Sequence, residues 1–205
     1  MKYFFMFFLS FLMVLTPQIL AQEDMVEEPS TDKLFPKVVT FTYEDVDYKL
    51  DITGTAVRKK MIFKVYGIAH YMQDPVHGKK EDIFNSILND SKAKQITMDF
   101  ARNVGGGKIQ GAYRDGFEKN ATEEELANIQ TSIDQFVGYF DTEVKKNEKY
   151  VLRWLPDSTV LSVVKGEEKP AIKNITFAKI LWKIWLGEKS IVKRKNLISF
   201  LTEKK

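Results

Sequence analysis

Strand and helix patterns are grouped along this chain rather than alternating, and this grouping narrows the possible folds. Residues 37–71 are rich in β-branched and aromatic residues, and within residues 48–53 Tyr, Leu and Ile alternate with Lys and Asp. Helical spacing of apolar residues follows in residues 80–88, 108–119, 122–140, 175–186 and 191–201, with further strands predicted at 95–100, 150–155 and 159–164. Segregated strands and helices predict an α+β fold rather than alternating βαβ units.

Several residues mark where the predicted elements begin and end. Thr122 with Glu125 three residues later is a capping box that opens a helix. Asn174 is a suitable N-cap for the helix that follows it, and Gly187 follows the last residue of that helix. Gly166 together with Pro170 predicts a break after the strand that ends at 164.

The first 21 residues are typical of a signal peptide. Lys2 supplies the positive start, residues 3–15 are almost wholly apolar, and Ala21 is a suitable small residue before a cleavage site. A run of about 13 apolar residues is too short to cross a bilayer, which needs roughly 20. We therefore expect an exported protein, periplasmic or alternatively extracellular, with no integral membrane segment after processing.

The rest of the chain divides into a short lead-in and one domain. Residues 22–35 are acidic and interrupted by proline, which predicts a flexible lead-in. Residues 36–201 are expected to form a single domain whose stability comes from a hydrophobic core, because the chain has no cysteine and therefore no disulfide.

Charge and motifs exclude several classes of function. Lysine and arginine total 31 against 28 acidic residues, and this balance argues against nucleic-acid binding. The glycines at 105–107 match neither the dinucleotide fingerprint nor the P-loop, because the required later Gly or Lys-Ser/Thr is missing. The two histidines, His70 and His77, do not form a recognisable metal-ligand set, so we expect neither a cofactor nor a metal.

Four polar residues are candidates for a ligand site: Arg58, Tyr66, Tyr113 and Asn120. A guanidinium offers a planar fork to a carboxylate, and a phenol hydroxyl is a suitable second donor. On one straight strand Arg58 and Tyr66 would lie about 26 Å apart, so they can share a head group only if the chain turns or bulges near Lys59.

The second pair has helical spacing. Tyr113 and Asn120 are two helical turns apart on one face, and Gly116 between them would leave room for a ligand. Each of the four residues also has a structural interpretation. Arg58 can be an exposed turn residue, the two tyrosines can be core aromatics, and Asn120 can serve only to end a helix.

Three stretches resemble the chalcone isomerase family, and most closely its bacterial, exported chalcone-isomerase-like branch. They are GTAVRKKMIFKVYGIAHYM at 54–72, YRDGFEKN at 113–120 and FAKILWKIWLGEKS at 177–190. The resemblance covers roughly residues 36–201. It implies a chalcone-isomerase-like open-faced sandwich, in which an antiparallel sheet has helices packed on one face and a ligand cleft lies between the sheet and the helices.

The resemblance also implies roles for the candidates. Arg58 matches the arginine that orients the substrate in the plant enzymes, and Tyr113 and Asn120 match residues of their active cleft. Tyr66 stands where those enzymes have threonine, and Ile184 where they have serine or threonine. The loss of two hydroxyl positions resembles the non-catalytic, fatty-acid-binding members, which pair the arginine with a tyrosine.

Three functions follow as hypotheses. The first is non-catalytic binding of a fatty-acid-like apolar carboxylate by Arg58 and Tyr66, with Tyr113 and Asn120 also lining the cleft. The second is an intramolecular lyase of chalcone-isomerase type acting on a phenolic ligand, with Arg58, Tyr113 and Asn120 as catalytic residues. The third is a structural or partner-binding envelope protein without a small ligand.

Overall fold

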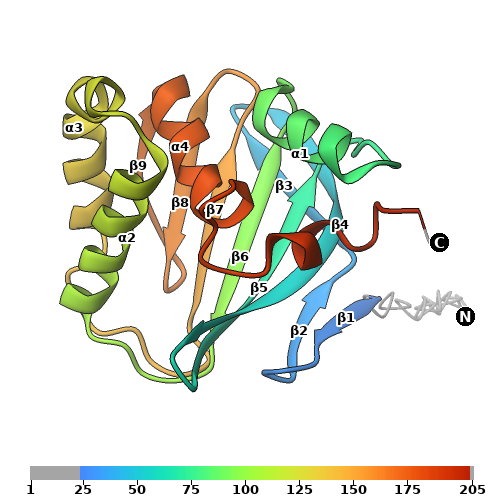
Figure 1. Ribbon diagram of the computed structural model, residues 1–205, viewed down its shortest axis with the longest axis horizontal. Helices are drawn as coiled ribbons and strands as arrows, with labels where there is room; N and C mark the ends of the chain where they lie inside the picture. Colours follow the sequence, from blue (N-terminus) through green and yellow to red (C-terminus); the bar gives the residue numbers. More distant parts are fainter. Residues whose placement is uncertain (1–23, 204–205) are drawn as a thin grey trace, which may run out of the picture.

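The computed structural model describes residues 24–203, which form nine strands, four α-helices and one 3₁₀ helix (Figure 1). The predicted signal peptide at 1–21 lies outside the described residues. The strands are β1 (Met25–Glu28), β2 (Lys33–Pro36), β3 (Val38–Tyr43), β4 (Val46–Lys60), β5 (Phe63–Met72), β6 (Lys94–Phe100), β7 (Lys149–Trp154), β8 (Thr159–Val164) and β9 (Glu167–Lys173). The helices are α1 (Lys80–Asn89), α2 (Gly106–Asn120), α3 (Glu123–Gly138), α4 (Ile175–Leu186) and the 3₁₀ helix η1 (Arg194–Ile198).

Seven strands form one antiparallel sheet in the order β3-β4-β5-β6-β7-β8-β9. Sequence neighbours are therefore sheet neighbours throughout, although α1 is inserted between β5 and β6, and α2 and α3 between β6 and β7. The helices pack on one face of this sheet (Figure 1). The predicted α+β class, with an antiparallel sheet and helices on one face, is confirmed.

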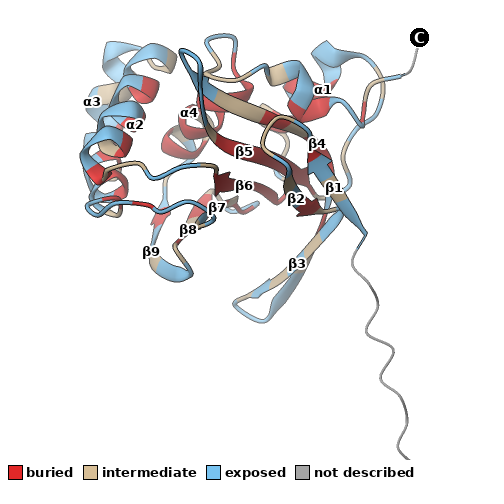
Figure 2. Ribbon diagram, turned by 90° about the horizontal axis from the view of Figure 1, so that it is seen from below, coloured by how far each residue is buried: buried red, intermediate tan, exposed pale blue. Residues whose placement is uncertain are grey.

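The main core fills the space between the sheet and the helices. Strand β6 is buried over its whole length, and Figure 2 shows that β5 and β6 run through the most buried part of the molecule. Helix α4 contributes the largest fully buried side chains, Trp182 and Trp185. Burial of aromatic side chains of this size makes a large hydrophobic contribution, consistent with a fold that has no disulfide.

The lead-in prediction for residues 22–35 is corrected for the part that the structure describes. Residues 25–36 form the β1–β2 hairpin, which covers a second core on the sheet face away from the helices. Phe35 is fully buried there, and Lys33 makes an ion pair with Asp99 of β6. Gly67 allows the close approach, because a Cβ at this position would lie 2.7 Å from Thr31 Oγ1. Acidic composition concealed these long-range contacts.

Two further predictions are wrong in detail. The expected break around Gly166 and Pro170 is instead a turn followed by β9, and Pro170 fits there because an edge strand has a neighbour on only one side. The helix expected over 191–201 is only the short 3₁₀ helix η1. The capping predictions are confirmed, since Thr122 and Glu125 form both bonds of the capping box and Asn174 accepts a bond from Phe177 N.

Candidate ligand-binding site

The turn between β4 and β5 brings Arg58 and Tyr66 together. The chain reverses at Met61 and Ile62, and Arg58 is then the direct cross-strand partner of Tyr66. Directly opposed residues of an antiparallel pair share one face and have Cβ atoms about 5 Å apart. The separation of about 26 Å expected for a straight strand is removed by this turn, which lies just beyond Lys59 and Lys60.

Arg58 and Tyr66 both reach toward the segment that contains α4. Arg58 is half-buried, and its Nη1 donates a hydrogen bond of 2.7 Å to the carbonyl oxygen of Ile191. Tyr66 is buried, and its hydroxyl accepts a 3.0 Å bond from Trp185 Nε1. Burial raises the pKa of Tyr66 to about 12, although the bond from Trp185 and the charge of Arg58 act in the opposite direction. The phenol is therefore protonated at neutral pH and can donate.

Tyr66 and five other aromatic residues form a closed circuit of side-chain contacts, which we call the aromatic circuit. Consecutive ring centroids lie 4.8–6.1 Å apart, and the Trp185–Tyr66 hydrogen bond closes the circuit. Its members are Tyr66, Phe100, Tyr150, Phe140, Tyr113 and Trp185. The circuit joins β5, β6 and β7 to α2 and α4, so it bridges the sheet and the helix layer.

Two hydroxyl groups in the aromatic circuit are poorly satisfied. Tyr113 Oη is 3.9 Å from the sulfur of Met98, a weak acceptor. Tyr150 is fully buried, and within residues 24–203 its hydroxyl has no hydrogen-bond partner. Burial raises the pKa of both phenols, so both are neutral. Tyr150 was not singled out from the sequence, which predicted only that residues 150–155 form a strand.

Gly116 does not leave room for a ligand, which corrects the sequence-based expectation. The side chain of Ile184 on α4 occupies the space beside it, and a Cβ at Gly116 would lie 2.8 Å from Ile184 Cδ1. The glycine therefore permits close packing of α2 against α4. In this structure the space between sheet and helices is filled by side chains of the chain itself.

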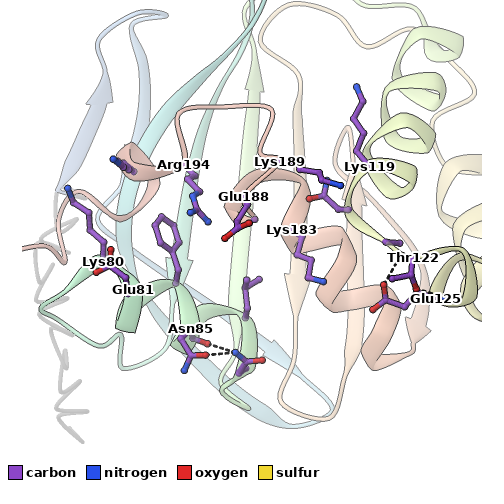
Figure 3. A pocket seen from close by; sticks show the side chains of 17 residues that line it. Lys80, Glu81, Asn85, Lys119, Thr122, Glu125, Lys183, Glu188, Lys189 and Arg194 are labelled. Carbon is purple, nitrogen blue, oxygen red and sulfur yellow. Dashed lines mark hydrogen bonds between the residues drawn. The ribbon is translucent and has the colours of Figure 1, made fainter.

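Asn120 lies apart from the other three candidates. It is the last residue of α2, and its Nδ2 donates a 2.9 Å bond to the carbonyl oxygen of Gly116. Its side chain lines an open groove of about 890 Å³ on the outer side of the helices (Figure 3). Arg58, Tyr66 and Tyr113 do not line this groove.

The groove runs between α1, the end of α4, the α2–α3 turn and η1. Phe84 and Leu88 contribute apolar surface, and Arg194 stacks over the Phe84 ring at 4.3 Å. The charged residues of its lining are Lys80, Glu81, Lys119, Glu125, Lys183, Glu188, Lys189, Arg194 and Lys195. Six of these residues are basic and three are acidic, so the groove presents a predominantly positive lining.

Metal-ligand geometry is not found in the described part of the chain. Residues 24–203 contain no group of three His, Asp or Glu side chains placed to hold a metal ion. His70 is instead fully buried between Thr53 and Trp182. The helices in this range are also too short or too polar to span a membrane.

These features define an α+β sandwich with an arginine–tyrosine pair above an aromatic interior. The chain belongs to the chalcone isomerase-like family, whose family model matches residues 36–196. A solved structure with a similar fold is that of a fatty-acid binding protein from Arabidopsis thaliana. The two chains are 14% identical, with a TM-score of 0.69, and the similarity covers 85% of this chain and 96% of the plant protein. No curated protein matches the chain.

Proposed function

We propose that this protein binds a fatty-acid-like apolar carboxylate without catalysing a reaction on it, and that Arg58 and Tyr66 hold the head group. The observation that carries the proposal is the direct cross-strand pairing of these two residues on the helix-facing side of the sheet. An arginine fork and a protonated phenol together supply the donors that a carboxylate accepts.

The present contacts of Arg58 and Tyr66 are ones that a ligand can replace. Arg58 Nη1 donates its hydrogen bond to a neutral carbonyl, Ile191 O, in the segment after α4. A carboxylate would replace this acceptor by a charged one, and such bonds are roughly twice as strong. At the same time Trp185 would move away from the Tyr66 hydroxyl. This movement would separate α4 from the sheet and open the aromatic circuit to the apolar tail of the ligand.

The fold similarity adds support of a different kind. The Arabidopsis protein is described as a fatty-acid binding protein, and it shares the fold with this chain over most of both lengths. Identity is low, so the ligand class is carried to this chain by the arginine–tyrosine pair and its surroundings rather than by the overall similarity.

The position of Asn120 supports binding over isomerisation. A chalcone-isomerase-type reaction would require Tyr113 and Asn120 to act on one ligand together with Arg58. Tyr113 lies in the aromatic circuit, whereas the Asn120 amide is bonded to its own helix and lines the outer groove. In the proposed role Tyr113 contributes to the walls around the tail.

A fatty-acid titration of the chain from Gln22 tests the proposal, with Arg58→Ala and Tyr66→Phe as variants. We expect saturable binding that Arg58→Ala weakens roughly tenfold or more, about 1.4 kcal/mol, because a charged donor is lost. Arg114→Ala is the matched control, since Arg114 is an exposed arginine paired with Asp134 on the outer side of α2 and α3.

The outcomes separate the three functions. Wild-type protein that binds no fatty acid would refute the proposal. If the protein converts a chalcone and Arg58→Ala abolishes this activity, the protein is an isomerase rather than a non-catalytic binding protein. Neither binding nor turnover would leave a structural or partner-binding role.

We also propose that the protein is exported to the periplasm after removal of residues 1–21. The support is the charged start, short apolar run and Ala21 of the sequence. Mass spectrometry of the protein isolated from cell fractions should find a mature N-terminus at Gln22, and an uncleaved chain would contradict this.

A further inference from the structure

The tip of the β4–β5 hairpin is an exposed apolar surface. Met61, Ile62 and Phe63 follow one another in the chain and are 88%, 85% and 52% exposed. Three large apolar side chains in succession at this exposure are costly in water unless something covers them. We call these three residues the apolar tip.

The other tight turns of the seven-stranded sheet are polar. The β3–β4 turn consists of Glu44 and Asp45, the β7–β8 turn contains Pro156 and Asp157, and the β8–β9 turn is Lys165 and Gly166. Within residues 24–203 the other three turns also connect neighbouring antiparallel strands, and they do so with polar residues. Connecting two strands therefore does not require the apolar residues of the tip.

The backbone of the tip also disfavours its sequence. Met61 has a φ of 55°, in the left-handed region where glycine or asparagine is preferred and a bulky residue is strained. A methionine at this position destabilises the turn without contributing to the core, since its side chain is almost fully exposed. The exposed side chain is thus present at a cost to the folded state.

The charged residues of the hairpin that lie near the apolar tip are all basic. Residues 55–68 contain Arg58, Lys59, Lys60 and Lys64 and no acidic residue. The neighbouring loop between β6 and α2 adds Arg102, whose guanidinium stacks over the Phe63 ring at 4.7 Å. Figure 1 shows the hairpin projecting from the lower end of the molecule beside this loop. The nearby loop between α3 and β7 has mixed charge.

We propose that the apolar tip inserts into the interfacial region of an anionic lipid bilayer, with the exposed Lys59, Lys60 and Lys64 on the lipid head groups. Apolar residues that enter the head-group boundary, next to lysines and arginines that attract anionic lipid, are the combination expected for peripheral membrane binding. An acidic protein surface would account for the lysines but not for the three consecutive apolar side chains.

Membrane docking would place the candidate ligand site close to the bilayer. Arg58 and Tyr66 lie on the same hairpin, only a few residues from the apolar tip. A bound tip would therefore present the arginine–tyrosine pair to the source of apolar carboxylates; this consequence, unlike the docking itself, rests on the proposed function.

Vesicle flotation tests the docking with the chain from Gln22, because every described strand and helix lies within residues 24–203. We expect the protein to float with phosphatidylglycerol–phosphatidylethanolamine vesicles and not with phosphatidylcholine vesicles. Met61→Gly with Ile62→Ser should weaken binding roughly tenfold or more. Glycine suits the positive φ, so this variant should keep its fold. Ile175→Ser, which alters a 54% exposed isoleucine on α4, is the matched control.

A labelled protein locates the contact. The chain contains no cysteine, so Ile62→Cys gives a single site for an environment-sensitive fluorophore. Its emission should shift to the blue on adding anionic vesicles, while a label at Val46→Cys on the β3–β4 hairpin should not respond. These experiments contain no fatty acid, so they can fail independently of the proposed function.

Three results would overturn the proposal. The first is wild-type protein that does not float with anionic vesicles. The second is equal binding of the wild type and the Met61→Gly, Ile62→Ser variant. The third is a dimer in sedimentation that the variant abolishes, without vesicle binding, which would assign the apolar tip to a second copy of the chain.

Discussion

Buried His70 should make the stability of this protein fall on mild acidification. Trp182 Nε1 donates a 3.3 Å bond to His70 Nε2, and the indole can only donate, so Nε2 carries no proton. The proton therefore lies on Nδ1 and is donated to Thr53 Oγ1 at 2.7 Å, while Thr53 donates to Leu197 O. Protonation of Nε2 would set two donors against each other in a fully buried site.

The direction and size of the effect follow from the pKa of His70. Burial, and secondly the charge of Lys94, lowers this pKa from 6.5 to about 3. Below pH 6.5 the unfolded chain binds a proton that the folded chain does not bind until about pH 3. Stability is therefore fully present above pH 6.5 and is lost as the pH falls, by up to about 1.4 kcal/mol per pH unit. Between about pH 7.5 and 5 the loss amounts to roughly 2 kcal/mol.

Urea unfolding over this pH range measures the effect. The range stops at about pH 5 because the carboxyl groups with lowered pKa values, such as Glu125 and Asp157, titrate below it. His70→Gln should remove most of the pH dependence, and His77→Gln should leave it unchanged. NMR offers a direct check, since the chain has only two histidines. A His70 ring signal that titrates near pH 6.5, or equal slopes for wild type and His70→Gln, would refute the reasoning.

Three further substitutions test the packing by urea unfolding. Thr122→Ala removes the acceptor of the capping-box bond to Glu125 N and should lower the free energy of unfolding by about 1 kcal/mol, whereas Thr122→Ser should retain most of it. Gly116→Val should cost about 1–3 kcal/mol by displacing Ile184, and Ile184→Ala in the same chain should recover part of this; additive losses would contradict the contact. Tyr150→Phe removes a buried hydroxyl without a partner among the described residues, so the free energy of unfolding should stay unchanged or rise. A loss above about 2 kcal/mol would show that this hydroxyl makes a bond in solution.

Local patterns predicted the elements of this protein well. Helix and strand types for residues 80–164 follow from the spacing of apolar residues, which depends only on neighbours within one or two turns. Thr122 and Asn174 could be assigned as caps for the same reason, because a cap bonds a backbone group three residues away.

Edges and hairpins were harder to predict. Composition concealed the β1–β2 hairpin, whose Phe35 is buried only because the sheet lies beneath it. Strand β9 was concealed by Pro170, which a local rule treats as a break although it is compatible with an edge strand. In both cases the deciding contacts are made to residues that are distant in sequence.

By itself the sequence determined the α+β class, the helix caps and the four polar candidates, because each depends on residue type and short-range spacing. Tertiary structure decided which candidates meet. It pairs Arg58 with Tyr66 across a turn, places Tyr113 with the unpredicted Tyr150, and leaves Asn120 in a separate groove. It also fills the space at Gly116 with Ile184. The physical reason is that register and layer packing are set by the total burial of apolar surface over the whole chain, and a local pattern carries no information about which distant side chain will complete a site.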